Sequence, residues 1–115
     1  VTAYFNSAGQ VVRVDERLDL AEYGSRTVEY GLADGSPFFI REIGSLRDLS
    51  REGKEALVPR GYEAALDLDG RVLGSNRYGP GFESGMDPVV GGARAHLDSL
   101  LERVEERVAG KVPTG

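Results

Sequence analysis

The stretch RTVEYGLADGSPFFIREI (residues 26–43) decides the fold, because it encodes two strands and the turn between them. Val28, Tyr30 and Leu32 alternate with more polar or smaller residues, and this period of two predicts a half-buried strand. Asp34-Gly35 then reverses the chain, since both residue types tolerate the positive φ of a tight hairpin turn. Pro37 lies at the start of the second strand, where a missing backbone N–H is tolerated best.

Two further stretches show the same hairpin pattern. In TAYFNSAGQVVRV (residues 2–14), short apolar runs lie on either side of Asn6-Ser7-Ala8-Gly9, which favours a chain reversal. Further along the chain, apolar and polar residues alternate again, and one predicted strand face consists of Tyr62, Ala64, Leu66 and Leu68. Asp69-Gly70 follows as a two-residue turn signal. The sequence therefore predicts three hairpins, whose flanks and spacing differ too much for a repeat.

The C-terminal part predicts one long amphipathic helix. Asp87 can cap it, Pro88 fits the first helical position, and Gly110 can end it. Apolar residues recur at intervals of three and four along one stripe, which consists of Val90, Ala93, Leu97, Leu100, Leu101, Val104 and Val108. The solvent side is expected to carry Arg94, Asp98, Glu102, Glu105 and Glu106. His96 lies beside the apolar stripe, which predicts a boundary position at the edge of the core.

A short helical segment is expected near residues 45–57, between the second and third hairpins. Ser45 and Asp48 fit a capping box, Gly53 weakens the middle, and Pro59 stops the helix.

These elements predict an α+β fold. An amphipathic helix must pack its apolar stripe on another element, and one face of the antiparallel sheet is the nearest candidate. The expected architecture is a sheet of about five to six strands packed against the long C-terminal helix. We expect a single α+β domain over residues 1–109 and a flexible C-terminal tail over residues 110–115.

Length and composition are those of one soluble domain. The 115 residues are 40% hydrophobic and 29% charged, which is ordinary for a globular chain with one core. No apolar run reaches the roughly 18 residues that span a bilayer, so no membrane partner is expected. The N-terminus shows no secretory signal, and if Val1 is an alternative start, the source is bacterial or phage. A cytoplasmic location is therefore expected.

Charge and residue usage disfavour several classes of function. The net charge of −5 and the pI near 4.9 argue against a nucleic-acid partner, which needs a basic face. The chain has no cysteine and one histidine, so disulfides, thiolate nucleophiles and sulfur-ligated metals are excluded. No metal or cofactor is expected. Because no Gly-x-Ser-x-Gly motif occurs, Ser–His catalysis is disfavoured and no catalytic residue is assigned.

LDLDGRVL (residues 66–73) resembles the first motif of haloacid-dehalogenase-type phosphatases, Asp-x-Asp-Gly-Thr after a buried strand. The resemblance implies a nucleophile at Asp67 and a general acid at Asp69. Arg71 stands where that family has Thr, and the preceding strand alternates in polarity instead of being apolar throughout. A hairpin turn is therefore the favoured interpretation. A dedicated calcium loop is disfavoured because Ala65 fills an expected ligand position.

The best candidate for function is NRYGPGFES (residues 76–84), interpreted as a glycine-rich loop. Aromatic and arginine side chains are the usual anchors of binding surfaces, and loops on a rigid scaffold commonly carry function. The predicted binding residues are Arg71, Asn76, Arg77, Tyr78, Phe82 and Glu83. In the competing interpretation, Tyr78 and Phe82 fold back over one end of the core as lid residues.

A hairpin, then PGFESGMDP (residues 80–88), then an amphipathic helix resembles the core of HicB-type antitoxins. Pro80, Gly81, Ser84 and Gly85 correspond to the Pro-Gly-Cys-x-Ser and the following Gly of that family. The Thr and the helix-opening Glu-Ala of the family are absent, and the resemblance leaves out the first half of the chain. It implies a regulatory protein that binds a partner.

Two hypotheses of function follow. The first is a small acidic protein-binding or regulatory module of the antitoxin, immunity or adaptor type, whose charge steers it toward a basic partner. Formation of a homodimer through an exposed strand edge is compatible with either hypothesis. The alternative is a small enzyme, or a domain that binds an anionic small ligand between the sheet and the loop. There Arg71 and Arg77 would hold the anion, and Asp67 or Glu83 would move a proton. An enzyme is the less favoured of the two.

Overall fold

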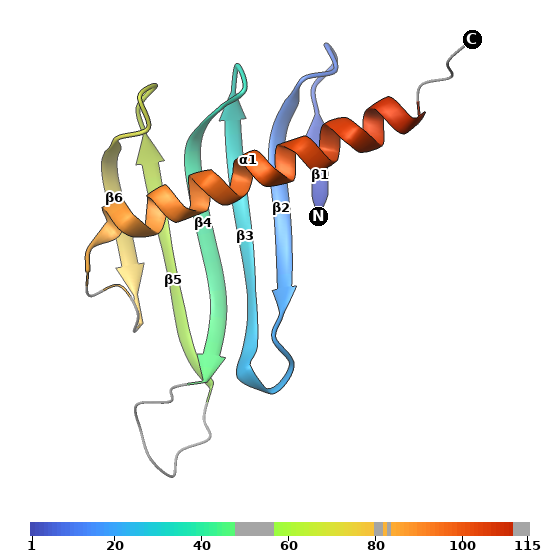
Figure 1. Ribbon diagram of the computed structural model, residues 1–115. Coiled ribbons are helices and arrows are strands. Elements are labelled where there is room, and N and C mark those ends of the chain that lie inside the picture. The colour runs from blue at the N-terminus through green and yellow to red at the C-terminus, as the bar shows by residue number, and fades with distance from the viewer. Residues whose placement is uncertain (48–56, 80–81, 83, 112–115) are drawn as a thin grey trace.

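The computed structural model describes residues 1–47, 57–79, 82 and 84–111, which form two layers (Figure 1). One layer is a six-stranded antiparallel sheet in the order β1-β2-β3-β4-β5-β6, and the other is one long helix, α1. The strands are β1 (Thr2–Phe5), β2 (Val11–Asp19), β3 (Gly24–Ala33), β4 (Ser36–Arg47), β5 (Leu57–Leu66) and β6 (Val72–Tyr78). Helix α1 spans Met86–Lys111, and a 3-10 turn, η1 (Ala21–Tyr23), joins β2 to β3. The predicted α+β class is confirmed.

Two of the hairpin turns are built in the same way. The side-chain Oδ1 of Asn6 and that of Asp67 each accept hydrogen bonds from the backbone N–H groups two and four residues further on, at 2.8 to 3.0 Å. Such bonds are the reason that Asn and Asp favour turns. The turn that begins at Asp67 is thus longer than the two residues predicted. It places Leu68 at its tip, 90% exposed, instead of on the inner strand face.

The central turn, between β3 and β4, has the predicted two-residue form. Asp34 and Gly35 have φ values of 51° and 80°, the left-handed values that a type I′ turn requires at both positions.

The core lies between α1 and one face of the sheet, the helix-facing side. The register of the strands brings Val14, Tyr30, Ile40 and Ala64 into one row across β2 to β5. These side chains are buried against Val90, Leu97 and Leu100 of α1, which confirms most of the predicted stripe. Full burial of such side chains stabilises a fold by about 1.5–3 kcal/mol each.

The predicted short helix is wrong at both of its ends. Ser45 belongs to β4, where it pairs with Ser25 of β3 and with Pro59 of β5, and Leu57 begins β5. Pairing on both sides satisfies the backbone of this segment, and it overrides the local capping pattern. Residues 48–56, including Asp48 and Gly53, lie outside the described residues.

Helix α1 begins one residue before the predicted cap, Asp87, and continues through Gly110 to Lys111. Residues 112–115 of the predicted tail lie outside the described residues. Arg94, expected on the solvent side, instead covers the turn at Gly70, where an added Cβ would be 2.1 Å from its Nη1. Nowhere in the described part of the chain does a helix combine the length and the hydropathy of a membrane span.

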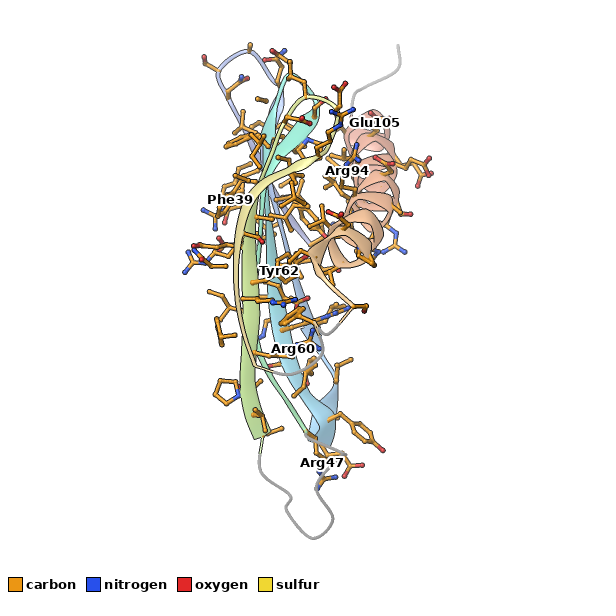
Figure 2. All side chains as sticks on the ribbon, turned by 90° about the vertical axis from the view of Figure 1, so that its left-hand side faces the viewer. Phe39, Arg47, Arg60, Tyr62, Arg94 and Glu105 are labelled. Carbon is orange, nitrogen blue, oxygen red and sulfur yellow. The ribbon has the colours of Figure 1, made fainter. Side chains whose placement is uncertain are left out.

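The sheet extends beyond the helix. Helix α1 crosses the strands and leaves the lower parts of β2 to β5 uncovered, as Figure 1 shows. In the edge-on view of Figure 2, α1 lies on one side of the sheet together with Arg60 and Tyr62, whereas Phe39 points to the other side, here called the open face. The described elements therefore leave two regions accessible, the open face and the strip beside α1.

Candidate functional site

The residues predicted as a binding loop begin in a strand. Asn76, Arg77 and Tyr78 belong to β6, the edge strand that pairs with β5. Because side chains alternate along a strand, Arg77 lies on the helix-facing side opposite Tyr62, and its two neighbours lie on the open face. The predicted site is thus divided between the two faces of the sheet.

Phe82 is part of the core rather than an exposed contact. It is 3% exposed, its ring packs edge-to-face on Tyr62 at 5.7 Å between centroids, and the guanidinium of Arg60 lies 4.5 Å from the ring centre. Its carbonyl oxygen accepts a hydrogen bond from Nη1 of Arg77. For Phe82 the structure agrees with the lid interpretation, whereas Tyr78 is 50% exposed. Glu83 lies outside the described residues.

The two arginines predicted to hold an anion lie at opposite ends of β6. The backbone N–H of Arg71 closes the turn by donating to Asp67, and Arg77 lies six residues further along. A strand rises about 3.3 Å per residue, so their backbones are roughly 20 Å apart. The structure does not bring Arg71 and Arg77 together.

A polar cavity of about 290 Å³ lies between α1 and the neighbouring, uncovered part of the helix-facing side of the sheet. The strand register places Glu16 (β2), Val28 (β3), Glu42 (β4) and Tyr62 (β5) in one row, and Arg26, Gly44 and Arg60 in the next. The titratable side chains that line the cavity are Glu16, Arg26, Tyr30, Glu42, Arg60, Tyr62 and His96. We call this set the polar cluster.

The carboxylates of the polar cluster lie deep, and its arginine and histidine side chains lie nearer the surface. Nε2 of His96 is 2.7 Å from Oε1 of Glu16. Nη1 of Arg26 donates to Oε1 of Glu42 at 3.2 Å, and Nη2 of Arg60 is 3.9 Å from Oε2 of Glu42. Both glutamate side chains are 7% exposed, against 19% for Arg60, 40% for Arg26 and 45% for His96. A molecule that enters the cavity therefore meets the arginine and histidine side chains before the carboxylates.

Two tyrosines complete the cavity as neutral groups. Burial raises the pKa of Tyr30 to about 12, with smaller contributions from Glu16 and Glu42, and Arg26 opposes the shift. Burial likewise raises the pKa of Tyr62, and the nearby Glu42 raises it further. Both phenols are therefore protonated at neutral pH and available as hydroxyl groups.

The polar cluster was not predicted from the sequence, although a signal for it exists. Glu16 stands between Val14 and Leu18 in the alternating pattern of β2, and Glu42 stands two residues after Ile40 in β4. A charged residue at an inward strand position is the unusual feature. His96 was predicted at the edge of the core, and there it meets Glu16.

The open face carries a second feature, at β4 to β6. Ile43 and Tyr78, respectively 43% and 50% exposed, flank Gly61 in one row of the sheet. A Cβ at Gly61 would be 2.7 Å from the Tyr78 hydroxyl oxygen, so the tyrosine side chain extends over the backbone of β5. The neighbouring row supplies Arg41, Glu63 and Asn76, and Nδ2 of Asn76 donates to Oε1 of Glu63 at 3.4 Å. We call these residues and Gly61 the Tyr78 patch.

No protein-family model, no curated protein and no solved structure matches this chain. The resemblances to HicB-type antitoxins and to haloacid-dehalogenase-type phosphatases thus rest on the short motifs alone. In the structure, Asp67 and Asp69 lie in the turn between two antiparallel strands, where Asp67 accepts backbone hydrogen bonds.

Proposed function

We propose that this protein is a protein-binding module that recognises its partner through the Tyr78 patch. The observation that supports this best is the exposed pair of Ile43 and Tyr78 on a face that the described elements leave uncovered. Arg41, Glu63 and Asn76 lie beside the pair and line the same shallow depression of about 220 Å³. An apolar centre with a polar rim is the usual anatomy of a protein interface.

The sheet makes this patch suitable for recognition. Tyrosine offers a large contact area with few rotatable bonds, so little side-chain entropy is lost on binding. The Tyr78 side chain is supported by the backbone at Gly61, which limits its freedom before the partner arrives. A pre-organised aromatic group on a rigid strand costs less to order than one on a mobile loop.

The charge of the chain favours a basic partner. The net charge is −5, and the exposed side of α1 includes Asp98, Glu102, Glu105 and Glu106. Complementary charge accelerates the encounter of two proteins more than it tightens the final complex. Inhibition of a basic protein, as by an antitoxin or an immunity protein, and an adaptor role both fit this proposal.

The test is affinity capture from the cells in which the protein is made, followed by native mass spectrometry. We expect wild-type protein to retain a partner of defined stoichiometry, and Tyr78→Ser and Ile43→Ser each to lose it. Leu73→Ser is the matched control, because Leu73 lies on the same edge strand, is 70% exposed and is outside the patch. Raising the salt concentration should slow association if charge steers the partner.

Arg41→Glu keeps the packing of the sheet and reverses one charge at the rim, so it tests the patch without removing an aromatic ring. Circular dichroism of each variant confirms that the fold is kept. A partner that stays bound to the Tyr78, Ile43 and Arg41 variants, or that Leu73→Ser removes equally well, would refute the assignment to this patch.

A further inference from the structure

We propose that the cavity beside α1 is a binding site for a small molecule that carries an oxyanion, held between Arg26 and Arg60. The oxyanion is a carboxylate or a phosphate. This site lies on the opposite side of the sheet from the Tyr78 patch, and the proposal does not depend on the protein-binding role.

The backbone brings the two arginines to the same gap. Arg26 on β3 and Arg60 on β5 are separated in the sheet by Gly44 on β4, which has no side chain. A Cβ at Gly44 would be 2.4 Å from the carbonyl oxygen of Ser25 and 2.8 Å from Cβ of Arg26. Only glycine therefore fits at this position. Because the register places this glycine between Arg26 and Arg60, no side chain fills the space between the two arginines.

The charges at this end of the cavity do not cancel. Arg26 and Arg60 both approach one carboxylate, that of Glu42. The other buried carboxylate, Glu16, lies two strands away and is engaged by His96. Near Gly44, two guanidinium groups therefore share a single carboxylate as their ion-pair partner, and a bound oxyanion would supply a second.

The two guanidinium groups also have hydrogen-bond donors to spare. Each has five N–H donors, and Nε of both Arg26 and Arg60 is buried and donates no hydrogen bond within the described structure. The contact between Arg60 and Glu42, at 3.9 Å, is an ion pair beyond hydrogen-bond distance. The oxygens of a carboxylate or phosphate accept several N–H groups at once, which is the preferred geometry of arginine.

The walls of the cavity limit the ligand to a small one. Helix α1 contributes Val89, Gly92 and Ala93, and the sheet contributes Leu18 and Val28, so the rest of the surface is small or apolar. The volume of about 290 Å³ is at the lower end of the range for ligand sites. The hydroxyl groups of Tyr30 and Tyr62 and the imidazole of His96 provide further polar contacts for the body of the ligand.

The experiment is an NMR titration of the arginine Nε–H signals with inorganic phosphate and, separately, with succinate, at constant ionic strength in chloride. We expect the Arg26 and Arg60 signals to shift together and to saturate. The tighter of the two probes identifies the class of oxyanion. A shift that does not saturate with either probe would overturn the proposal.

Three variants sharpen the result. Arg26→Gln should weaken binding about tenfold or more, because a charged donor is lost. Glu42→Gln keeps the shape of the site and removes the competing carboxylate, so binding should tighten about fivefold to tenfold. Arg17→Gln is the matched control, since Arg17 is an exposed residue of β2 on the open face, outside the Tyr78 patch, and it should bind as wild type does. Weaker binding by Glu42→Gln, or equal losses in the two arginine variants, would contradict the site. If Arg26→Gln fails to fold, the comparison of Glu42→Gln with Arg17→Gln decides.

Discussion

Two neighbouring regions on the helix-facing side of the sheet are built from the same strands and have opposite chemistry. The row Val14, Tyr30, Ile40 and Ala64 lies under α1 and is closed and apolar. Two residues further along the same strands, the row contains Glu16 and Glu42, and α1 only overhangs it. Strand alternation decides which side chains face the helix. The path of the helix then decides which of them become core and which line an accessible cavity.

The largest effect is expected in the closed row. Ile40→Ala should lower the free energy of unfolding by about 2–5 kcal/mol, since Ile40 is fully buried and the truncation leaves a cavity. Urea denaturation measures it. Ile43→Ala removes the same atoms from the same strand on the open face, and it should cost less than about 1 kcal/mol. Equal costs for the two variants would mean that the division between the faces is wrong.

A smaller loss is expected in the polar row. Glu42→Ala leaves Arg26 and Arg60 facing each other without a carboxylate, and it should cost about 1–3 kcal/mol, because both arginines reach some solvent. Glu63→Ala, at an outward position of β5, should change stability by no more than about 0.5 kcal/mol. The same denaturation experiment compares them. If Glu42→Ala were neutral, the buried ion pairs would not contribute to the fold.

High pH should lower the stability of the fold through Tyr30, a buried residue of the closed row that also lines the cavity. The pKa of Tyr30 is about 12 in the folded protein, against the ordinary tyrosine value of 10.0 in an unfolded chain, so folding favours the protonated phenol. This contribution to stability is complete below pH 10 and is lost as the pH rises from 10 to 12, because the unfolded chain ionises first. Urea denaturation at pH 9 and pH 11 should show the fall, and Tyr30→Phe should reduce it. Tyr23→Phe, a substitution at an exposed tyrosine, should leave the fall unchanged.

The smallest effect, and the only gain, is expected in α1. An added Cβ at Gly91 meets nothing within 4 Å, and the position is inside a helix. Gly91→Ala should therefore stabilise the protein by about 0.5–1 kcal/mol, seen as a rise in Tm. Gly44→Ala should instead lower the Tm, because the added Cβ would overlap the backbone of Ser25. A loss of stability in Gly91→Ala would show that this helical turn packs more closely than described.

Much of the architecture was predictable because it depends on neighbours in the chain. Asn6 and Asp67 form turns with groups at most four residues away, and Asp34-Gly35 supplies the φ values of its own turn. The stripe of α1 is likewise a local pattern of threes and fours. The prediction at Ser45 was wrong because its structure depends on residues far away in the chain. A capping pattern predicted a helix start, and pairing with two strands far away in the sequence decided otherwise.

The candidate sites were only partly predictable. Tyr78 was singled out by residue type, and its place beside Ile43 depends on the register of three strands. Phe82 was singled out for the same reason, and the structure buries it under Arg60. An aromatic residue in a glycine-rich segment has the same pattern whether it faces solvent or core. Residue type alone therefore could not separate the two.

The sequence by itself determined the three hairpin turns, the alternation of their strands and the amphipathic helix, because each arises from hydrogen bonds and side-chain directions within a few residues. Only the tertiary structure decided where charge gathers. Glu16 and His96 are 80 positions apart, and Arg26, Glu42 and Arg60 come from three different strands. Their meeting depends on the register of the whole sheet and on the path of α1 across it, and both are set by the sum of packing over the core rather than by any one segment.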